Sequence, residues 1–377
     1  MITRDLQKVI EQNLFKGKAI VLIGPRQVGK TTLLKLITEK TALPALTLNC
    51  DEPEPRELLT NTNSQKLKQL IGNYKVVLID EAQRVKNIGL TLKLIIDNIK
   101  DVQLLVSGSS ALEIANEIKE PLTGRKYEYN LFPFSTNELV NSTNTLTEKQ
   151  LLEKRLLYGS YPDVINNPSE SAEILMNIAS SYLYKDILAF NQVRRPAQLE
   201  KLVQALALQL GSEVSYNELS QIIQTDNQTV ERYIDLLEQS FVVFRLGAFS
   251  GNIRNEIKKS KKIYFYDNGI RNAVIQNFSP LTLRQDVGAL WENYFMAERM
   301  KFNHYNRKLI KSYFWRSFQQ QEIDLIEQEN GLLTAYELKW NTRRNTKIPK
   351  TFSDNYILKD NYTISPNNYF DFLTKPT

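Results

Sequence analysis

The sequence has few of the residues that cross-link a fold or bind a metal through sulfur and imidazole. Its 377 residues include a single cysteine, Cys50, and a single histidine, His304. One cysteine excludes an intramolecular disulfide and is typical of a reducing compartment. Together, one cysteine and one histidine also make a Cys/His zinc site implausible.

Long apolar stretches are missing as well. The longest runs, such as Ala19-Ile-Val-Leu-Ile23, have about five residues, far fewer than the ~20 needed to span a bilayer. The first residues, Met1-Ile-Thr-Arg-Asp-Leu-Gln-Lys8, mix acidic and polar side chains where a signal peptide needs a continuous apolar segment. We therefore expect a cytoplasmic protein with no membrane partner.

The length and composition predict a globular protein of several domains. At roughly 150 residues per domain, 377 residues correspond to two or three domains. The content of 42% hydrophobic and 24% charged residues is that of a soluble globular chain. The 48 Lys and Arg against 42 Asp and Glu give a net charge of +6. This small excess permits a nucleic-acid partner but does not establish one.

The first part of the chain has an α/β pattern. Short apolar runs that end near glycine or acidic residues alternate with helical patterns, which predicts a parallel sheet with helices on both faces. We expect this P-loop type of domain to span residues 1–140. Its predicted strands lie at 18–24, 46–48, 76–79 and 102–106, and its clearest predicted helices at 31–38 and 88–99.

Residues 141–284 are expected to form a helical lid followed by a winged helix. Two amphipathic patterns, 216–224 and 227–237, are separated by a short polar turn, and Ser215 and Asp226 are suitable N-caps for them. Strand candidates follow at 241–246 and 263–266. This order of elements is the outline of a winged helix.

Such a module has two alternative roles, as a DNA contact or as a lid that contacts protein. On the DNA reading, the second helix and the basic loop between the two strands would meet phosphates and base edges. The residues concerned are Asn227, Gln228, Thr229 and Arg232 on the helix, and Arg254, Lys258, Lys259, Lys261 and Lys262 in the loop.

The strongest motif is Gly24-Pro-Arg-Gln-Val-Gly-Lys-Thr31, which matches G-x-x-x-x-G-K-[ST]. It follows a predicted strand and opens a predicted helix, the context in which this motif binds phosphate. Glycines let backbone N–H groups turn toward phosphate oxygens, and the helix adds its positive N-terminal end. Lys30 is expected at the β/γ-phosphates and Thr31 on Mg²⁺. The predicted nucleotide-binding residues are Gly24, Pro25, Arg26, Gln27, Val28, Gly29, Lys30, Thr31 and Thr32.

A second element supports nucleotide hydrolysis. The run Val76-Val-Leu-Ile-Asp80-Glu81 is an apolar strand that ends in two acids. Asp80 is expected to hold Mg²⁺ directly or through water. Glu81 is expected to orient or deprotonate the attacking water, so the pair predicts ATP hydrolysis in which Lys30 and Glu81 are catalytic.

Two further residues are assigned to the reaction with alternatives left open. Ser107-Gly-Ser-Ser110 follows another predicted strand, and we expect Ser109, in preference to Ser107, to sense the γ-phosphate; the alternative is a simple turn. Arg125 would offer a cation to the transition-state charge, in cis or from a neighbouring subunit. The alternative for Arg125 is an ordinary surface arginine.

These motifs together resemble those of bacterial and archaeal AAA-family ATPases that carry a C-terminal domain of unknown function. Leu78-Ile-Asp-Glu-Ala-Gln83 and Leu122-Thr-Gly-Arg125 belong to the resemblance, which extends over essentially the whole chain through Tyr182-Leu-Tyr-Lys-Asp-Ile187, Lys262-Ile-Tyr-Phe-Tyr-Asp-Asn-Gly-Ile270, Trp291-Glu-Asn293 and Glu322-Ile-Asp324. The resemblance implies an ATPase core related to the origin-recognition and signalling branch, followed by a winged helix and a nuclease-like fold.

The carboxyl-terminal part, residues 285–377, is expected to be that nuclease-like α/β domain. A helix at 287–302, a strand at 312–316 and a hairpin at 323–340 carry Glu292, Asp324, Glu337 and Lys339, which resemble the PD-(D/E)XK pattern. In that chemistry two carboxylates hold Mg²⁺ and the lysine activates water. Trp340, Arg343, Arg344, Lys347 and Lys350 lie nearby in the sequence and would meet a nucleic-acid backbone.

Three other readings of these acids stay open: a surface ion-pair set, a fold that has lost catalysis, or a docking surface. The sequence as a whole therefore predicts an AAA-type ATPase that uses ATP and Mg²⁺ and moves the winged helix and nuclease-like module on DNA. The alternative is a nucleotide-controlled signalling switch or scaffold with protein partners and no nuclease activity. A homo-oligomer is compatible with both.

Overall fold

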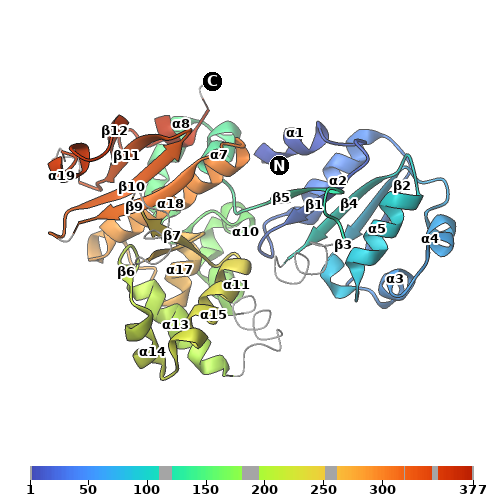
Figure 1. Ribbon diagram of the computed structural model, residues 1–377, viewed down its shortest axis with the longest axis horizontal. Coiled ribbons are helices and arrows are strands. Elements are labelled where there is room, and N and C mark those ends of the chain that lie inside the picture. Colours follow the sequence, from blue (N-terminus) through green and yellow to red (C-terminus); the bar gives the residue numbers. More distant parts are fainter. Residues whose placement is uncertain are drawn as a thin grey trace. The chain divides into compact units, whose positions relative to one another are not determined.

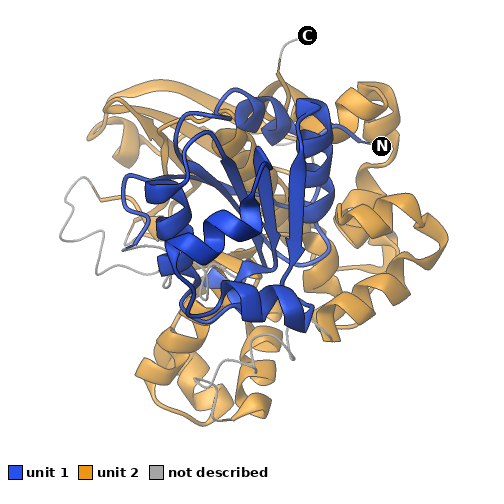
Figure 2. Ribbon diagram, turned by 90° about the vertical axis from the view of Figure 1, so that its right-hand side faces the viewer, with its two compact units in different colours: residues 1–134, 239–241 blue, residues 135–238, 242–377 orange. Residues whose placement is uncertain are grey.

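The computed structural model of the chain describes residues 2–109, 121–180, 195–250, 261–317, 319–341 and 347–375 (Figure 1). Their contacts define two compact units (Figure 2). The first unit contains residues 1–134 and 239–241, and the second contains residues 135–238 and 242–377. The first unit thus ends close to the predicted domain boundary at residue 140.

The first unit is built on a five-stranded parallel sheet in the order β2-β3-β4-β1-β5. Strands β1, β3 and β4 are buried at every position. Because successive residues of a strand face opposite sides, this burial shows that both faces of the sheet are covered, as predicted. The strands are β1 (Ala19–Ile23), β2 (Ala45–Asn49), β3 (Val76–Asp80), β4 (Gln103–Gly108) and β5 (Lys126–Asn130).

Helices of the first unit pack on this sheet and on one another. Helix α2 (Lys30–Thr41) contacts β3, β4 and α1 (Asp5–Glu11), and α4 (Ser64–Ile71) contacts α5 (Ile88–Asn98). The described residues of this unit also form the helix α3 (Pro53–Leu59) and the 3-10 turn η1 (Ala82–Arg84). The predicted helices at 31–38 and 88–99 are confirmed by α2 and α5.

The second unit is built on a seven-stranded mixed sheet in the order β12-β11-β10-β9-β7-β8-β6. Strands β10 and β11 form the predicted hairpin, and its two turn residues Asn330 and Gly331 both have positive φ angles, as a tight type I′ turn requires. The strands are β6 (Glu213–Val214), β7 (Val243–Ala248), β8 (Lys261–Phe265), β9 (Lys311–Arg316), β10 (Glu322–Glu329), β11 (Leu332–Leu338) and β12 (Leu358–Ile364).

Figure 1 shows the long helix α18 behind the orange and red strands of this sheet, and α18 contacts β8 and β11. The described residues of the second unit form many helices. They are α7 (Thr136–Ser142), α8 (Thr145–Gln150), α9 (Leu152–Tyr158), α10 (Pro162–Asn166), η2 (Pro168–Glu170), α11 (Ser171–Ile178), α13 (Pro196–Leu208), α14 (Tyr216–Ile223), α15 (Asn227–Gln239), α17 (Asn268–Val274), η4 (Leu281–Leu283), α18 (Val287–Tyr305), α19 (Lys350–Ser353) and α20 (Phe370–Leu373).

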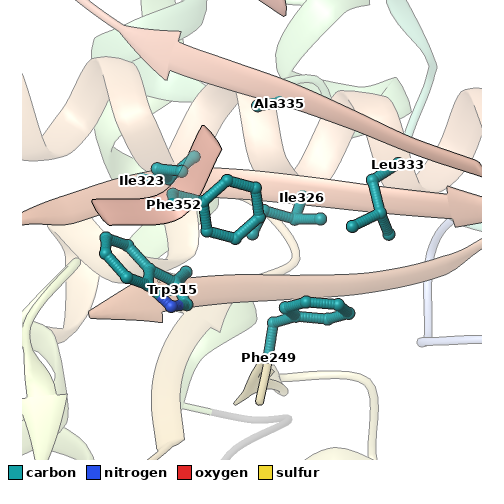
Figure 3. Close-up of a cluster of buried hydrophobic side chains, with 7 residues drawn as sticks. All are labelled: Phe249, Trp315, Ile323, Ile326, Leu333, Ala335 and Phe352. Atoms are coloured by element: carbon teal, nitrogen blue, oxygen red, sulfur yellow. The ribbon is translucent and has the colours of Figure 1, made fainter. Parts of the chain in front are cut away.

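A cluster of buried apolar side chains packs against the strands of the hairpin. Phe249, Trp315, Ile323, Ile326, Leu333, Ala335 and Phe352 form it (Figure 3). Ile323 and Ile326 are three residues apart, yet both belong to this cluster because the pairing of β10 with β9 shifts register between them. Such a bulge re-aims the neighbouring side chains, and Asp324 lies inside it.

The predicted helix-turn-helix is present as α14 and α15. The side chain of Ser215 accepts a hydrogen bond from the Glu218 N–H, and Asp226 accepts one from the Thr229 N–H, so both predicted caps are confirmed. Strand β8 pairs with β6 and with β7, both antiparallel.

The strands on either side of residue 284 belong to one sheet. Strand β7 runs parallel to β9, with Gly247 opposite Tyr313 and Ala248 opposite Phe314. The contacts therefore do not separate residues 141–284 from residues 285–377, and the division into three domains stays a prediction. Among the described residues, no helix combines the length and the apolar character needed to cross a membrane.

Candidate functional site

The carboxyl ends of three neighbouring strands bring together the motifs of the first unit. Strands β3, β4 and β1 are adjacent and parallel, so the residues that follow them lie at one edge of the sheet. Gly24 follows β1, Asp80 and Glu81 end or follow β3, and Ser107 and Ser109 end or follow β4. Residues 24–32, 80–81 and 107–109 are thereby placed side by side.

The loop between β1 and α2 depends on its two glycines for different reasons. A Cβ atom on Gly24 would stand 2.0 Å from the carbonyl oxygen of Leu131, so no larger residue fits there. Gly29 has a φ of +91°, in the region that only glycine adopts readily, and it directly precedes helix α2. This backbone turns the first amides of α2 toward the loop, where the helix end favours an anion.

Lys30 lies inside this loop. Its side-chain ammonium donates hydrogen bonds to the carbonyl oxygens of Gly24 (2.8 Å) and Pro25 (2.7 Å). The residue is buried, and it is the first residue of α2. The loop therefore encloses a positive charge at the end of a helix, an arrangement that binds phosphate oxygens.

Thr31 and Asp80 meet although they are far apart in the sequence. The Thr31 hydroxyl donates to both carboxylate oxygens of Asp80, at 3.0 and 2.9 Å. The Ser107 hydroxyl donates to the same carboxylate. Hydroxyl and carboxylate oxygens are ligands of Mg²⁺, whose remaining positions are commonly filled by phosphate oxygens and water. Thr31 and Asp80 thus fit a magnesium ion bound beside a nucleotide.

Glu81 is held by a residue that the sequence analysis did not assign. The side-chain amide of Gln83, in η1, donates to a Glu81 carboxylate oxygen at 2.5 Å and to the Ser109 hydroxyl at 2.8 Å. The Glu81 N–H donates to the Ser107 hydroxyl at 3.3 Å. Ser107 thus faces Asp80, whereas Ser109 connects through Gln83 to Glu81. The only sequence signal for Gln83 was its place in Asp80-Glu-Ala-Gln83.

Arg125 does not join this group. It directly precedes β5, and its carbonyl oxygen accepts a hydrogen bond from the N–H of Ala19, the first residue of β1. Arg125 therefore lies at the amino edge of the sheet, opposite the edge that carries Gly24 to Thr31. Its guanidinium pairs with Asp97 at 2.8 Å. The structure thus does not support the expected action in cis, and action in trans stays a prediction.

The remaining predicted loop residues frame the site. Val28 is fully buried, and its carbonyl oxygen accepts a hydrogen bond from Arg4. Gln27 has a φ of +61°, so the loop turns sharply at that residue. Pro25 contributes its carbonyl oxygen to Lys30, as described above, whereas Arg26 and Thr32 complete the run within the loop and the first turn of α2.

The second unit contains a cluster of charged side chains that includes the four predicted nuclease-like residues. Lys339 pairs with Glu337 at 3.0 Å and with Asp324 at 3.5 Å, and Asp324 also accepts a hydrogen bond from the Leu338 N–H at 2.7 Å. The ammonium thus bridges the carboxylates of two adjacent strands. Burial, and next the charge of Asp324, raise the pKa of Glu337 to about 7.

Glu292 has different partners. Its Oε1 atom accepts hydrogen bonds from Lys262 (3.1 Å) and from the Tyr264 hydroxyl (2.6 Å), and Lys262 also pairs with Glu322. Lys262 and Tyr264 lie on β8, so a strand predicted as part of the wing contributes to the cluster. The sequence pattern predicts Lys262 in the basic loop and does not identify Tyr264 or Glu322 as members of this site.

A divalent metal ion does not fit this second cluster as well as it fits Asp80 and Thr31. The described residues contain no group of three Asp, Glu, His or Cys side chains arranged to hold a metal ion. Each of the four carboxylates of this second cluster already has a lysine ammonium as its neighbour. No catalytic step through a metal is therefore derived for this cluster.

Several residues that were named from the sequence as parts of a motif or as contacts fall outside the described part of the chain. Ser110, residues 182–187, Arg254, Lys258, Lys259, Arg343 and Arg344 are among them. On α15, Asn227, Gln228 and Arg232 are exposed and Thr229 is half-buried. Cys50 is fully buried, as expected for a packed residue, and burial together with the charge of Asp80 raises the pKa of its thiol to about 12.

The parallel sheet, the glycine loop with its lysine, and the Asp-Glu pair on a neighbouring strand define a P-loop nucleotide-binding fold. Comparison with known families agrees, because residues 16–140 match the family model described as AAA domain. The first unit therefore has the fold of an AAA-type P-loop ATPase. Residues 149–281 and 287–370 match two models that are each described as a domain of unknown function (DUF8612 and DUF4143).

Relatives that match about nine tenths of the chain occur in a bacterium and in an archaeon. The chain is 26% identical over 342 residues to the uncharacterized protein Rv2008c of Mycobacterium tuberculosis, covering 89% of this chain and 73% of that protein. It is 23% identical over 366 residues to the uncharacterized protein MJ1544 of Methanocaldococcus jannaschii, covering 90% and 78%.

Among solved structures, the RuvB Holliday junction branch migration motor of Thermotoga maritima overlaps with 65% of this chain and 90% of its own, at 15% identity and a TM-score of 0.35. The Pif1 helicase of Candida albicans overlaps with 47% of this chain and 48% of its own, at 14% identity and a TM-score of 0.27.

Proposed function

We propose that this chain is a Mg²⁺-dependent ATPase whose nucleotide cycle repositions a winged helix and a nuclease-like module on DNA. The observation that carries the ATPase part is the contact of Thr31 with Asp80 at 3.0 and 2.9 Å, beside a glycine loop that encloses Lys30. This contact joins a phosphate-binding element to a metal-holding element from another strand. Both are needed to bind a metal nucleotide.

In the proposed mechanism, the loop amides and Lys30 bind and orient the phosphates. Magnesium, held by Thr31 and Asp80, would supply positive charge to the phosphate oxygens. Glu81 orients the attacking water and accepts its proton, because it is the acid next to Asp80. Ser109, linked to Glu81 through Gln83, contacts the terminal phosphate.

The test compares ATP turnover by the wild-type protein, Lys30→Ala and Glu81→Gln. Both variants should lose at least about 100-fold in kcat/KM, since each removes a group that acts on the transition state. Glu81→Gln should still bind ATP in calorimetry, because the phosphate loop is unchanged, and it serves as the control for folding. Equal turnover by all three proteins would eliminate the proposal.

The proposed binding to DNA is supported by the exposed residues of α15 and by the net charge. Helix α15 follows a short turn after α14 and exposes Asn227, Gln228 and Arg232, and the chain has a net charge of +6. A helix presented in this way reaches a DNA groove in winged-helix proteins. Contacts to phosphates would make the binding weaken steeply as salt rises.

The corresponding experiment measures fluorescence anisotropy of duplex and single-stranded DNA over a range of salt concentrations. Arg232→Ala should weaken binding and reduce the salt slope by about 1. Lys154→Ala, an exposed lysine on α9, is the matched control and should leave both unchanged. Absence of DNA binding, combined with a molecular mass that changes with nucleotide, would favour the signalling switch instead.

A further inference from the structure

Lys262 is a buried lysine in the middle of the second charged cluster. It is the second residue of β8, and its side chain is 2% exposed. Burial alone would lower its pKa, but the carboxylates of Glu292 and Glu322 raise the pKa above the ordinary lysine value. The ammonium therefore stays charged inside the protein, where only paired charges are stable.

The ammonium group of Lys262 contacts two carboxylates and stands over an aromatic ring. Its Nζ atom lies 3.1 Å from Glu292 Oε1, contacts Glu322 Oε1, and stands 5.5 Å from the centre of the Phe314 ring. Glu292 comes from α18 and Glu322 from β10. One ammonium thus joins a helix and a strand that both bring carboxylates to the cluster.

The ammonium group of Lys339 pairs in the same way with the other two carboxylates, those of Asp324 and Glu337. Four carboxylates are therefore bridged in two pairs by two ammonium groups. A divalent cation binds to several oxygen atoms that have no competing cation. Two ammonium groups among these oxygens compete for them and repel a second positive ion.

We propose that Lys262 is a built-in cation of this cluster, which balances Glu292 and Glu322 in place of a divalent metal ion, so that the wild-type cluster does not load one. The pattern Glu292, Asp324, Glu337-x-Lys339 then keeps the residue types of a metal-dependent nuclease but serves to hold β8, α18, β10 and β11 together. This inference does not depend on ATP hydrolysis in the first unit.

The proposal predicts a gain of metal binding when the lysine charge is removed. Lys262→Met keeps most of the side-chain volume and leaves Glu292 and Glu322 without their cation. Lys262→Arg keeps the charge and is the matched control. All variants carry Asp80→Asn, which removes the carboxylate of the predicted magnesium site in the first unit, and nucleotide is left out.

The measurement is Mn²⁺ binding by electron paramagnetic resonance, with free Mn²⁺ up to about 1 mM. The Asp80→Asn protein and its Lys262→Arg derivative should show no saturable site in this range. The Lys262→Met derivative should gain one site that binds at least about tenfold tighter. Adding Asp324→Asn to it should weaken that site again, because the charge of Asp324 also acts on Lys262 and Glu292.

Two outcomes would overturn the proposal. One is a saturable Mn²⁺ site in the Asp80→Asn protein that disappears on Asp324→Asn, because the wild-type cluster would then load a metal despite Lys262. The other is a folded Lys262→Met protein with no gain in Mn²⁺ affinity. If circular dichroism shows that Lys262→Met does not fold, Lys262→Gln replaces it, since the amide also removes the charge but can still donate hydrogen bonds to Glu292 and Glu322. A folded Lys262→Gln protein with no gain in Mn²⁺ affinity would equally contradict the proposal.

Discussion

The Gln83 side chain links two residues that are predicted to be catalytic, Glu81 and Ser109. Its amide nitrogen donates both to Glu81 and to Ser109, which come from the ends of β3 and β4. Glu81 itself has a φ of +51°, so its backbone is in a conformation that few residues favour. The position of the Glu81 carboxylate therefore depends on this hydrogen bond.

Gln83→Leu should lower kcat for ATP hydrolysis about 10- to 100-fold, because a displaced general base loses its geometry. The KM and the ATP affinity should change little, since Lys30 and Thr31 are intact. Steady-state kinetics together with calorimetric ATP binding separates the two effects. A rise in KM with unchanged kcat would show that Gln83 acts on binding and not on Glu81.

Gly24 is the second residue for which geometry makes a sharp prediction. An alanine Cβ at this position would lie 2.0 Å from the Leu131 carbonyl oxygen, which is backbone and cannot rotate away. Gly24→Ala should therefore destabilise the first unit by at least about 2 kcal/mol and weaken ATP binding.

The matched control is Gly288→Ala. Gly288 lies in α18, and a Cβ added there meets no atom within 4 Å. Alanine is the better helix former, so the stability change should be between zero and about 1 kcal/mol in favour of the variant. Thermal unfolding measures both variants, and equal melting temperatures would contradict the steric argument.

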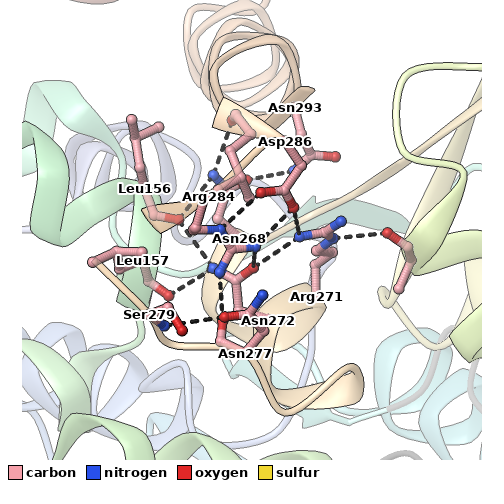
Figure 4. Close-up of polar contacts among 12 residues, drawn as sticks. Leu156, Leu157, Asn268, Arg271, Asn272, Asn277, Ser279, Arg284, Asp286 and Asn293 are labelled. Atoms are coloured by element: carbon pink, nitrogen blue, oxygen red, sulfur yellow. Dashed lines mark hydrogen bonds and ion pairs between the residues drawn. The ribbon is translucent and has the colours of Figure 1, made fainter. Parts of the chain in front are cut away.

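At the scale of elements, α17 is joined to the start of α18 by buried polar groups (Figure 4). Asp286 accepts hydrogen bonds from Arg271 (2.6 Å) and from Arg284 (2.8 and 2.7 Å), and both arginine side chains are almost fully buried. Arg271 also donates to the Ala207 carbonyl oxygen of α13 at 2.8 Å. One carboxylate thus balances two buried guanidinium groups.

Asp286→Asn should destabilise the second unit at pH 7 by about 1–2 kcal/mol, because it leaves both guanidinium groups without a counter-charge at a site that solvent partly screens. Burial alone would raise the pKa of Asp286, but the hydrogen bonds from Arg284 and Arg271 lower it to about 2. A folded-state pKa below the unfolded value of 3.8 means that the ionised group stabilises the fold above about pH 4.

That contribution, about 1–2 kcal/mol because solvent partly screens the group, is lost as the pH falls from about 4 to about 2. The difference in stability between the wild-type protein and Asp286→Asn should therefore narrow in this range. Urea unfolding at a series of pH values provides the measurement. A difference that stays constant down to about pH 2 would show that the charge of Asp286 has no part in it.

The elements that could be predicted from the sequence are those with a local signal. The buried strands β1, β3 and β4 are continuous apolar runs, and Asn330-Gly331 marks the hairpin. Strands β5 and β12 are edge strands with half of their residues polar, so they carry no such run and were not predicted. The motifs that follow β1 and end β3 were enough to assign Thr31 and Asp80 to one predicted Mg²⁺ site, and the structure brings these two side chains into contact.

Residues whose role depends on distant partners could not be predicted in the same way. Lys262 directly follows another lysine and was interpreted as part of a basic loop. Its burial becomes apparent only when α18 and β10 bring Glu292 and Glu322 to it. Gln83 was missed for the same reason, because its partner Ser109 is 26 residues away.

At the scale of the whole molecule, the position of Arg125 decides whether this residue can act within its own chain or only on a neighbouring subunit. The residue precedes β5 and lies at the amino edge of the sheet, whereas Gly24 to Thr31 follow β1 at the carboxyl edge. Arg125 therefore cannot reach a nucleotide in the loop of its own chain. The Arg125 side chain is 39% exposed, and its guanidinium pairs with Asp97 at a surface where solvent screens the pair, so a partner can displace Asp97.

If Arg125 acts on a neighbouring subunit, two inactive variants should restore each other. Arg125→Ala keeps an intact phosphate loop, and Lys30→Ala keeps an intact arginine. Each alone should lose at least about 100-fold in turnover, since an arginine that meets transition-state charge contributes about that much or more. A mixture of the two variants should regain activity in proportion to the fraction of assemblies that contain both chains. In such an assembly, Arg125 of the Lys30→Ala chain can contact a nucleotide bound in the intact phosphate loop of the Arg125→Ala chain. Asp97→Asn is the control and should keep wild-type turnover.

Two results would contradict action in trans. Full activity of Arg125→Ala alone would show that Arg125 is a surface arginine. An inactive mixture of the two variants, in which the subunits demonstrably exchange, would exclude action in trans.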